Sequence, residues 1–119
     1  MTGALRRVLS RLTTSDSDAH AAELQENSRG LGATPVRNCV TGDRQTVSGR
    51  VRALTLRPVG GVPALEAELF DGTGVIVLVF LGRRQIRGID PGRSLSATGR
   101  VSDRGKERVM FNPAYQLHS

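Results

Sequence analysis

Residues 64–82 read ALEAELFDGTGVIVLVFLG, two apolar runs on either side of the turn sequence Asp71–Gly74. In the first run, leucine and alanine alternate with glutamate, which is the period of a half-buried strand. The second run is apolar throughout and has the length of a strand. An Asp-Gly pair between two such runs is a strong hairpin signal. The stretch therefore predicts a β-hairpin with Glu66 and Glu68 on one face.

Further strand patterns lie on both sides of this hairpin. Apolar and polar residues alternate over three segments, residues 46–56, 94–103 and 108–117. The apolar phase of the first segment slips by one residue, which predicts a bulge or glycine bend near Gly49. Residues 82–92 predict a short helical turn with Ile86 and Ile89 inward, and Asn112-Pro113 interrupts the last strand. Five strands with one helical connection are enough to close a small barrel.

The strand predicted over residues 75–81 is apolar on both faces. We expect one face to fill the barrel, and assign to it Val75, Val77 and Val79. The other face is formed by Ile76, Leu78 and Phe80. Because an exposed apolar face needs a cover, it should meet the N-terminal helix, another subunit or a ligand. An alternative function stays open here, a protein–protein interaction or oligomerisation module that uses this face and the N-terminal helix.

The chain of 119 residues suits one small domain and a tail. Apolar residues at helical spacing predict a helix over residues 5–12, and a second helix is expected over residues 19–28. We assign residues 1–43 to an N-terminal helical extension and linker, and residues 44–119 to the barrel. The N-terminus lacks the apolar core of a signal peptide, and no run has the length of a membrane span.

The single cysteine, Cys39, excludes a disulfide within the chain, which fits a reducing compartment. We therefore expect a cytoplasmic protein with no membrane partner.

The net charge is +6, and all of the excess positive charge lies in residues 44–119, which contain twelve arginines and lysines and six acidic residues. A basic folded domain attracts polyanions, nucleic acid above all.

No set of residues predicts catalysis. His20 and His118 have no partner at the spacing of a metal site or a general base. We interpret Glu66 and Glu68 as a solvated strand face rather than a catalytic pair. The glycine-rich turns are not followed by the helix of a phosphate-binding loop. We predict a protein that is not an enzyme and that uses no metal and no cofactor.

Short motifs follow one another in a fixed order along the second part of the chain. They are GRV (49–51), DGTG with its apolar strand (71–80), DPG (90–92), ATGRV (97–101) and NPAYQL (112–117). Together they resemble the OB-fold domains found in the wedge domain of the branch-migration helicase, in bacterial polymerase subunits and in tRNA anticodon-binding domains. The whole looks like a small standalone OB-fold protein of the actinobacterial type.

This resemblance, which covers about residues 44–117, implies a five-stranded OB-fold barrel. With the helices expected before it, the predicted fold class is all-β, a five-stranded OB-fold barrel with an N-terminal α-helical extension. The resemblance also implies binding of single-stranded or branched nucleic acid without catalysis. In an OB-fold barrel the ligand crosses the second and third strands, between the loop after the first strand and the loop between the fourth and fifth.

These positions give the candidate site for single-stranded DNA or RNA. It consists of Arg50, Arg52, Arg57, Phe70, Phe80, Arg100, Arg104, Lys106 and Arg108. Phe70 and Phe80 would stack on bases, whereas we expect Phe111 in the core. Binding that depends on arginine loops should be weak, tolerant of sequence and sensitive to salt. A second basic cluster, Arg83, Arg84 and Arg87, should lie elsewhere on the barrel.

Overall fold

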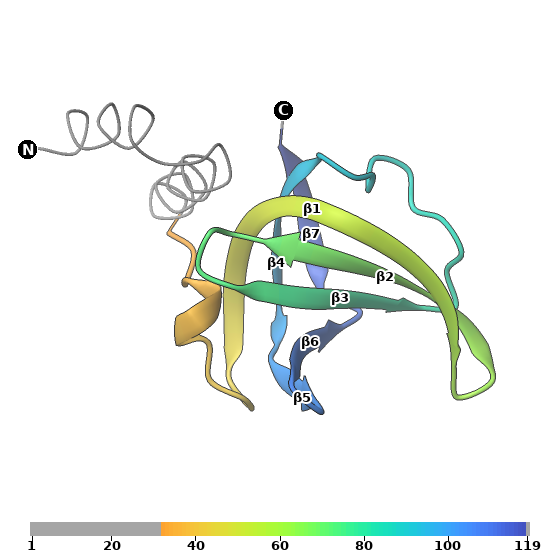
Figure 1. The fold of residues 1–119 in the computed structure, drawn as a ribbon, viewed down its shortest axis with the longest axis horizontal. Coiled ribbons are helices and arrows are strands. Elements are labelled where there is room, and N and C mark those ends of the chain that lie inside the picture. The colour runs from red at the N-terminus through yellow and green to blue at the C-terminus, as the bar shows by residue number, and fades with distance from the viewer. Residues whose placement is uncertain (1–31, 119) are drawn as a thin grey trace, which may run out of the picture.

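The computed structural model describes residues 32–118, which form a strongly curved sheet (Figure 1). One 3₁₀ turn, η1 (Val36–Asn38), precedes the sheet, and no α-helix occurs in this part of the chain. The strands are β1 (Arg44–Val59), β2 (Val62–Phe70), β3 (Val75–Leu81), β4 (Ser94–Arg100), β5 (Ser102–Arg104), β6 (Glu107–Phe111) and β7 (Ala114–His118). The predicted helices before residue 32 lie outside the described residues.

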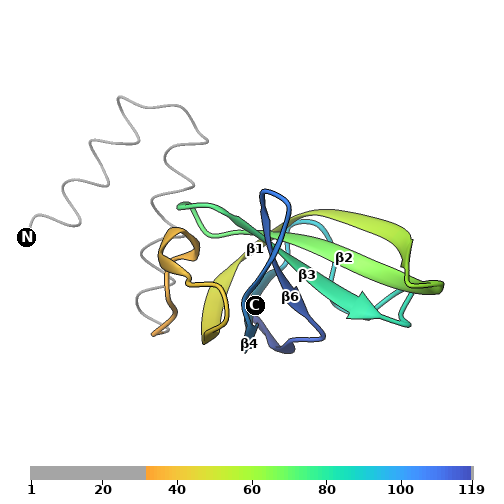
Figure 2. The ribbon, with the colours of Figure 1, turned by 90° about the horizontal axis from the view of Figure 1, so that it is seen from below.

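The strands are ordered β5-β6-β3-β2-β1-β4-β7 in one sheet. The β3–β6 pair is parallel, and all other pairs are antiparallel. The long strand β1 arches across the molecule (Figures 1 and 2). Its first half pairs with β4 and its second half with β2, with a register shift between Val51 and Ala53. The predicted bulge near Gly49 is therefore confirmed, a few residues further along.

The prediction of a closed five-stranded barrel is wrong in strand number and in closure. The fourth predicted strand is divided at Val101 into β4 and β5, and the fifth is divided at Asn112-Pro113 into β6 and β7. Because of the second break, β6 pairs with β3 whereas β7 pairs with β4. The short strands β5 and β7 are left at the two edges, so the hydrogen-bonded sheet stays open.

Asn112 makes the second break possible. Its φ of 50° is left-handed, a conformation that asparagine tolerates better than most residues. The Asn112 backbone N–H donates to the Val79 carbonyl oxygen at 2.7 Å. Its side-chain Oδ1 accepts a hydrogen bond from the Leu81 N–H at 2.9 Å. Asn112 thus continues the hydrogen bonding along β3 while the chain turns away toward β7.

The segment after β3 consists of turns rather than the predicted helical turn. Gly88 and Gly92 have φ angles of 90° and 91°, which break a right-handed helix. Ile86 and Ile89 are buried, as predicted. The loop therefore packs against the main core through its isoleucines, with Arg83, Arg84 and Arg87 exposed.

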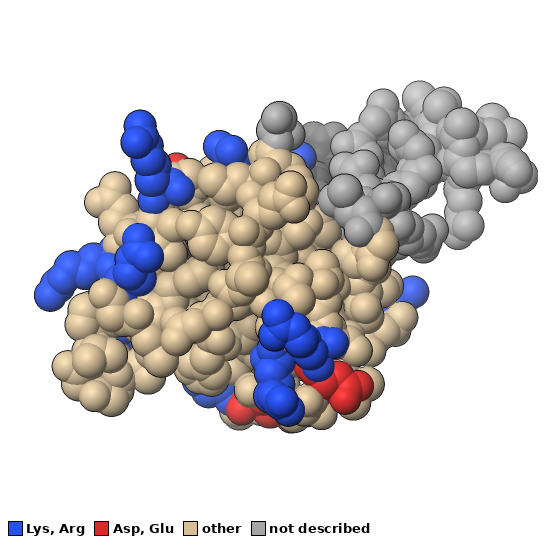
Figure 3. Space-filling view, turned by 180° about the vertical axis from the view of Figure 1, so that it is seen from behind, with Lys and Arg blue, Asp and Glu red and all other residues tan. Residues whose placement is uncertain are grey.

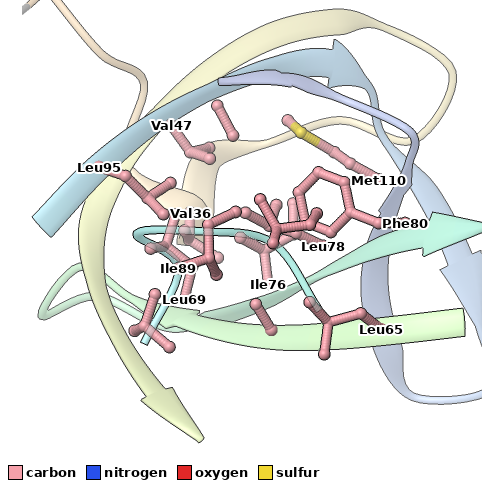
Figure 4. Packing of buried hydrophobic residues seen from close by; sticks show 14 of the residues in the cluster. Val36, Val47, Leu65, Leu69, Ile76, Leu78, Phe80, Ile89, Leu95 and Met110 are labelled. Atoms are coloured by element: carbon pink, nitrogen blue, oxygen red, sulfur yellow. The ribbon is translucent and has the colours of Figure 1, made fainter. Parts of the chain in front are cut away.

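The main core lies inside the curved sheet (Figure 4). It contains Leu65, Ala67 and Leu69 from β2, as the alternation predicts, together with Ile76, Leu78 and Phe80 from β3. The assignment of the β3 faces is thus wrong. The turn at Asp71–Gly74 places Phe70 opposite Val75, so that Leu69 lies opposite Ile76 on the inner side. Val77 and Val79 instead join Ala64 and Val109 in a second, smaller cluster.

Residues 33–39 pack against the barrel although they precede the expected domain boundary. Val36 is fully buried in the main core. The Thr34 N–H donates to the Thr46 carbonyl oxygen at 2.8 Å. Cys39 is buried as well, and desolvation raises the pKa of its thiol. The boundary at residue 43 remains a prediction, since the rest of the extension lies outside residues 32–118.

Asp71 joins this segment to the β2–β3 turn. Its buried carboxylate accepts hydrogen bonds from the Val36 N–H at 2.8 Å (Oδ2) and from the Thr73 N–H at 2.8 Å (Oδ1). The Thr73 hydroxyl and the Gly74 N–H donate to the same Oδ1, at 2.7 and 3.1 Å. A buried carboxylate is tolerated when donors surround it in this way.

We expect Asp71→Asn to lower the free energy of unfolding by about 2 kcal/mol, because the amide NH₂ would face the Val36 N–H with no acceptor between them. Chemical denaturation measures the change. Asp103→Asn is the matched control, because Asp103 is exposed on β5 and its substitution should cost less than about 0.5 kcal/mol. Equal stabilities of the two variants would contradict this role of Asp71.

Candidate nucleic-acid interface

The candidate interface is the side of β1, β2, β3 and β6 that points away from the main core, called the outer face below. Strand register places its residues in rows across the sheet. The central row contains four neighbouring residues, one from each strand: Phe111 of β6, Val79 of β3, Glu66 of β2 and Thr55 of β1. One end of the face carries Phe70, opposite Arg50, and the other carries Ala64, opposite Arg57.

Glu66 occupies the centre of the outer face and is only 3% exposed. The Arg104 guanidinium donates to both carboxylate oxygens, from Nη1 at 2.8 Å and from Nη2 at 2.9 Å. Arg57 Nη2 lies 3.3 Å from Glu66 Oε1. Hydrogen bonds from Arg104 hold the pKa of Glu66 below its usual value, although burial opposes this shift. The interpretation of Glu66 as a solvated residue is therefore wrong.

Glu66 brings together two segments that are distant in sequence. Arg57 comes from the end of β1, and Arg104 comes from β5, at the tip of the β5–β6 hairpin. Arg104 also pairs with Glu107 at 3.0 Å. These are the two loops that the sequence predicts to flank the ligand. They meet over β2, but their arginines are bound to a carboxylate of the protein.

A second ion pair on the outer face is more accessible. Arg52 Nη2 lies 2.8 Å from Glu68 Oε1, and the two side chains are 56% and 33% exposed. An exposed pair of this kind contributes little to stability and exchanges readily. Arg52 can therefore leave Glu68 for another anion at small cost, whereas Arg104 cannot leave the buried Glu66.

The structure collects only part of the predicted site. Arg50, Arg52, Arg57, Phe70 and Arg104 belong to the outer face or its edge, and Lys106 is exposed in the β5–β6 turn beside them. The two remaining arginines lie elsewhere. Arg100 is opposite Arg44 at the start of β1 and donates to the Gly42 carbonyl oxygen at 2.9 Å. Arg108 is directed toward the Arg37 carbonyl oxygen at 3.4 Å.

The aromatic residues differ from the sequence prediction. Phe80 is 5% exposed in the main core, so it cannot stack on a base. Its ring meets the edge of Tyr115, with centroids 5.7 Å apart and planes at 82°. Phe111, expected in the core, is 43% exposed on the outer face. Phe111 is the neighbour of Val79 in the parallel β3–β6 pair, and Val79 lies on the outer side opposite Glu66.

Basic side chains stand in separate groups when the molecule is seen from behind (Figure 3). Acidic side chains are visible mainly beside the lower group, and a largely uncharged surface separates the groups. On this face of the molecule the positive charge is therefore divided between separate groups and does not form one continuous patch.

Neither a metal-binding group nor a membrane-spanning helix occurs in residues 32–118. The His, Cys, Asp and Glu side chains of this part do not gather in threes around a possible ion position. No helix here is long and apolar enough to cross a bilayer. The expectations of a cytoplasmic location and of no enzymatic activity stay predictions.

No known protein family model and no curated protein sequence matches the chain. Solved structures do. A structure of RecG bound to a three-way DNA junction matches with a TM-score of 0.61 and 15% identity, over 72% of this chain and 12% of that chain. The p204 HINb domain matches with a TM-score of 0.60 and 15% identity, over 89% of this chain and 53% of the other.

These similarities define the class of the fold, which is OB-like. The fold-level resemblance to the branch-migration helicase is thus confirmed, although the chain spans only a small part of RecG and about half of the HINb chain. The actinobacterial type inferred from the motifs stays a prediction.

Proposed function

We propose that this protein is a non-enzymatic, cytoplasmic nucleic-acid-binding protein that holds single-stranded DNA or RNA on its outer face. The observation that carries the proposal is the convergence of basic side chains from β1 and from the β5–β6 hairpin on a sheet face with one exposed aromatic residue, Phe111, and one half-buried aromatic residue, Phe70. The OB-like fold shared with part of RecG, solved with a DNA junction, supports nucleic acid as the ligand class.

Phe70 and Phe111 provide the stacking positions. Phe70 lies opposite Val75, and Phe111 lies beside Val79, four residues further along β3. At about 3.3 Å per residue, the two positions are separated by about 13 Å along the strand direction. Stacking of a base on such a ring contributes about 1–3 kcal/mol and does not depend on base identity.

Phosphate groups would be bound by the accessible cations of this face. Arg52 and Arg57 are 56% and 52% exposed, and Lys106 has no carboxylate partner among the described residues. A phosphate can replace Glu68 on Arg52, because the exposed pair is weak. Contacts to phosphate carry no base information, so binding should be weak, tolerant of sequence and lost steeply with salt.

The alternative of an interaction module finds no support in residues 32–118. It depends on a free apolar face of β3 formed by Ile76, Leu78 and Phe80. All three are at most 5% exposed and belong to the main core. These side chains are part of the main core inside the curved sheet, so β3 presents no free apolar face there.

The double substitution Arg52→Gln with Lys106→Gln should weaken binding of a single-stranded oligonucleotide and flatten its salt dependence. The slope of log K against log salt should become less negative by about 1.4, because two phosphate contacts are lost. Fluorescence anisotropy at several salt concentrations measures it. Arg104 is left intact, because it holds the buried Glu66.

The control is Arg37→Gln with Arg44→Gln, which removes the same charge from exposed positions at and before the start of β1. It should change the slope by less than about 0.5, since these residues lie outside the outer face. Equal slopes for both double variants would show that only total charge matters and would remove the outer face as the site.

A further inference from the structure

A second concentration of positive charge lies outside the outer face, in residues 82–93, called the basic loop below. It holds four arginines, Arg83, Arg84, Arg87 and Arg93, and a single acid, Asp90. No ion pair between two described residues involves these arginines. On the outer face, in contrast, Arg52, Arg57 and Arg104 are all bound to glutamates. The basic loop therefore holds three exposed arginines, Arg83, Arg84 and Arg87, that form no ion pair with a carboxylate of the described residues.

The basic loop is held in place by its apolar residues and its backbone. Ile86 and Ile89 are 4% and 1% exposed in the main core. The Ile89 N–H donates to the Ile86 carbonyl oxygen at 3.1 Å, and the Gly92 N–H donates to the Val51 carbonyl oxygen at 2.8 Å. The exposed side chains of Arg83, Arg84 and Arg87 thus project from a fixed backbone, which reduces the entropy lost when they bind an anion.

The start of the basic loop is continuous with one end of the outer face. The Gly82 N–H donates to the Pro63 carbonyl oxygen at 2.7 Å, which places Arg83 beside the beginning of β2. In the sheet, Leu81 lies opposite Ala64, and Ala64 lies opposite Arg57. Two strand spacings, about 10 Å, therefore separate the backbone of Arg57 from that of Leu81. Figure 1 shows the loop leaving the end of β3 next to the β1–β2 hairpin.

We propose that the basic loop is a second phosphate-binding surface, which continues the path of a single strand from Arg57 around the end of β3. This inference rests on the proposed function and extends it to a longer ligand. The loop carries guanidinium groups and no aromatic residue, so it would bind the sugar–phosphate backbone without reading bases. Affinity should then rise with oligonucleotide length until the strand reaches both surfaces.

The test compares Arg83→Gln with Arg84→Gln, as a double variant of the full chain, with the wild-type protein. The probes are fluorescent oligothymidylates of increasing length, titrated at several salt concentrations. For the longest probe, we expect the slope of log K against log salt to become less negative by about 1.4. We also expect its affinity at low salt to fall on the order of tenfold. For the shortest probe that the wild-type protein binds, the affinity should not change, because that strand stays on the outer face.

The control is again Arg37→Gln with Arg44→Gln, and thermal unfolding checks that each variant is folded. An equal loss for short and long probes, or an equal loss in the control, would overturn the second surface. Long-probe binding that is weakened by Arg52→Gln with Lys106→Gln but not by the loop variant would overturn this inference and leave the proposed function intact. Absence of binding by the wild-type protein to any probe would overturn both.

Discussion

Gly49→Ala should lower the free energy of unfolding by about 3 kcal/mol, equivalent to a fall in melting temperature on the order of 15 °C. At this position β1 crosses directly against the end of β2. A Cβ on Gly49 would overlap the Phe70 carbonyl oxygen. It would also lie 2.9 Å from the Phe70 carbonyl carbon and 3.2 Å from the Asp71 Cα. All three are backbone atoms, which cannot move aside as the end of a side chain can. The strands must separate or bend to admit the methyl group.

Gly99→Ala provides the matched control for this prediction. Gly99 is also buried in a strand, but its nearest neighbours are the Pro113 Cβ at 3.4 Å, the Pro113 Cα at 3.5 Å and the Met110 Sδ at 3.6 Å, which are all ordinary contacts. Its substitution should cost less than about 1 kcal/mol. Thermal and chemical denaturation of the two variants give the comparison. A Gly49→Ala protein as stable as Gly99→Ala would mean that β1 does not approach β2 as described.

Arg104→Met should lower the free energy of unfolding by about 3 kcal/mol. Glu66 is 3% exposed in the structure, and the substitution removes both of its hydrogen bonds from Arg104, which leaves Arg57 at 3.3 Å as its ion-pair partner. A buried carboxylate that loses its main partner strongly lowers the free energy of unfolding. Arg52→Met is the control, because it breaks the exposed Arg52–Glu68 pair and should cost less than about 1 kcal/mol.

The double variant Glu66→Leu with Arg104→Met tests whether the cost comes from the unpaired carboxylate. Replacement of both partners by apolar side chains should recover most of the stability, because neither charge is then buried alone. A double variant as unstable as Arg104→Met would assign the loss to packing of the arginine rather than to its ion pair.

The same pair makes stability depend on pH. Because the pKa of Glu66 is lower in the folded protein than in the unfolded chain, its ionised form stabilises the fold. This contribution is present above the unfolded pKa, about 4.3, and is lost as the pH falls through the lower folded value. Arg104→Met should therefore flatten the decline in stability below about pH 4.3.

Much of the fold could be predicted from the sequence because its signals are local. Strand β3 matches the predicted range 75–81, and the Asp71–Gly74 turn is where the Asp-Gly signal predicts it. The slip of apolar phase in β1 correctly indicates a register shift. The isoleucines of the basic loop were placed correctly, although the glycines with positive φ prevent a helix there.

What could not be predicted depends on contacts that are distant along the chain. In the sequence, Glu66 has the pattern of an exposed strand residue. Its burial depends on Arg104, which is 38 residues later in the chain and binds it in the fold. The faces of β3 cannot be read from seven consecutive apolar residues, because such a run has no period. Phe111 becomes exposed through the parallel pairing of β6 with β3 and the left-handed Asn112, neither of which leaves a periodic signal.

The ion pair between Arg104 and Glu66 decides which residues of the candidate site can be substituted in a binding experiment. The sequence places Arg104 among the candidate ligands of phosphate, but its guanidinium is bound to Glu66 and its replacement would damage the fold. A loss of binding in that variant would therefore be ambiguous. Accessible residues such as Arg52 and Lys106 can be changed without this complication.

The central claim, that this protein binds single-stranded nucleic acid, is tested most directly by one titration. Fluorescent single-stranded DNA, duplex DNA and single-stranded RNA of equal length are titrated with the full chain at two salt concentrations. We predict micromolar or tighter binding of a single strand at low salt, which weakens steeply at the higher concentration. Absence of binding to all three probes at low salt would contradict the claim.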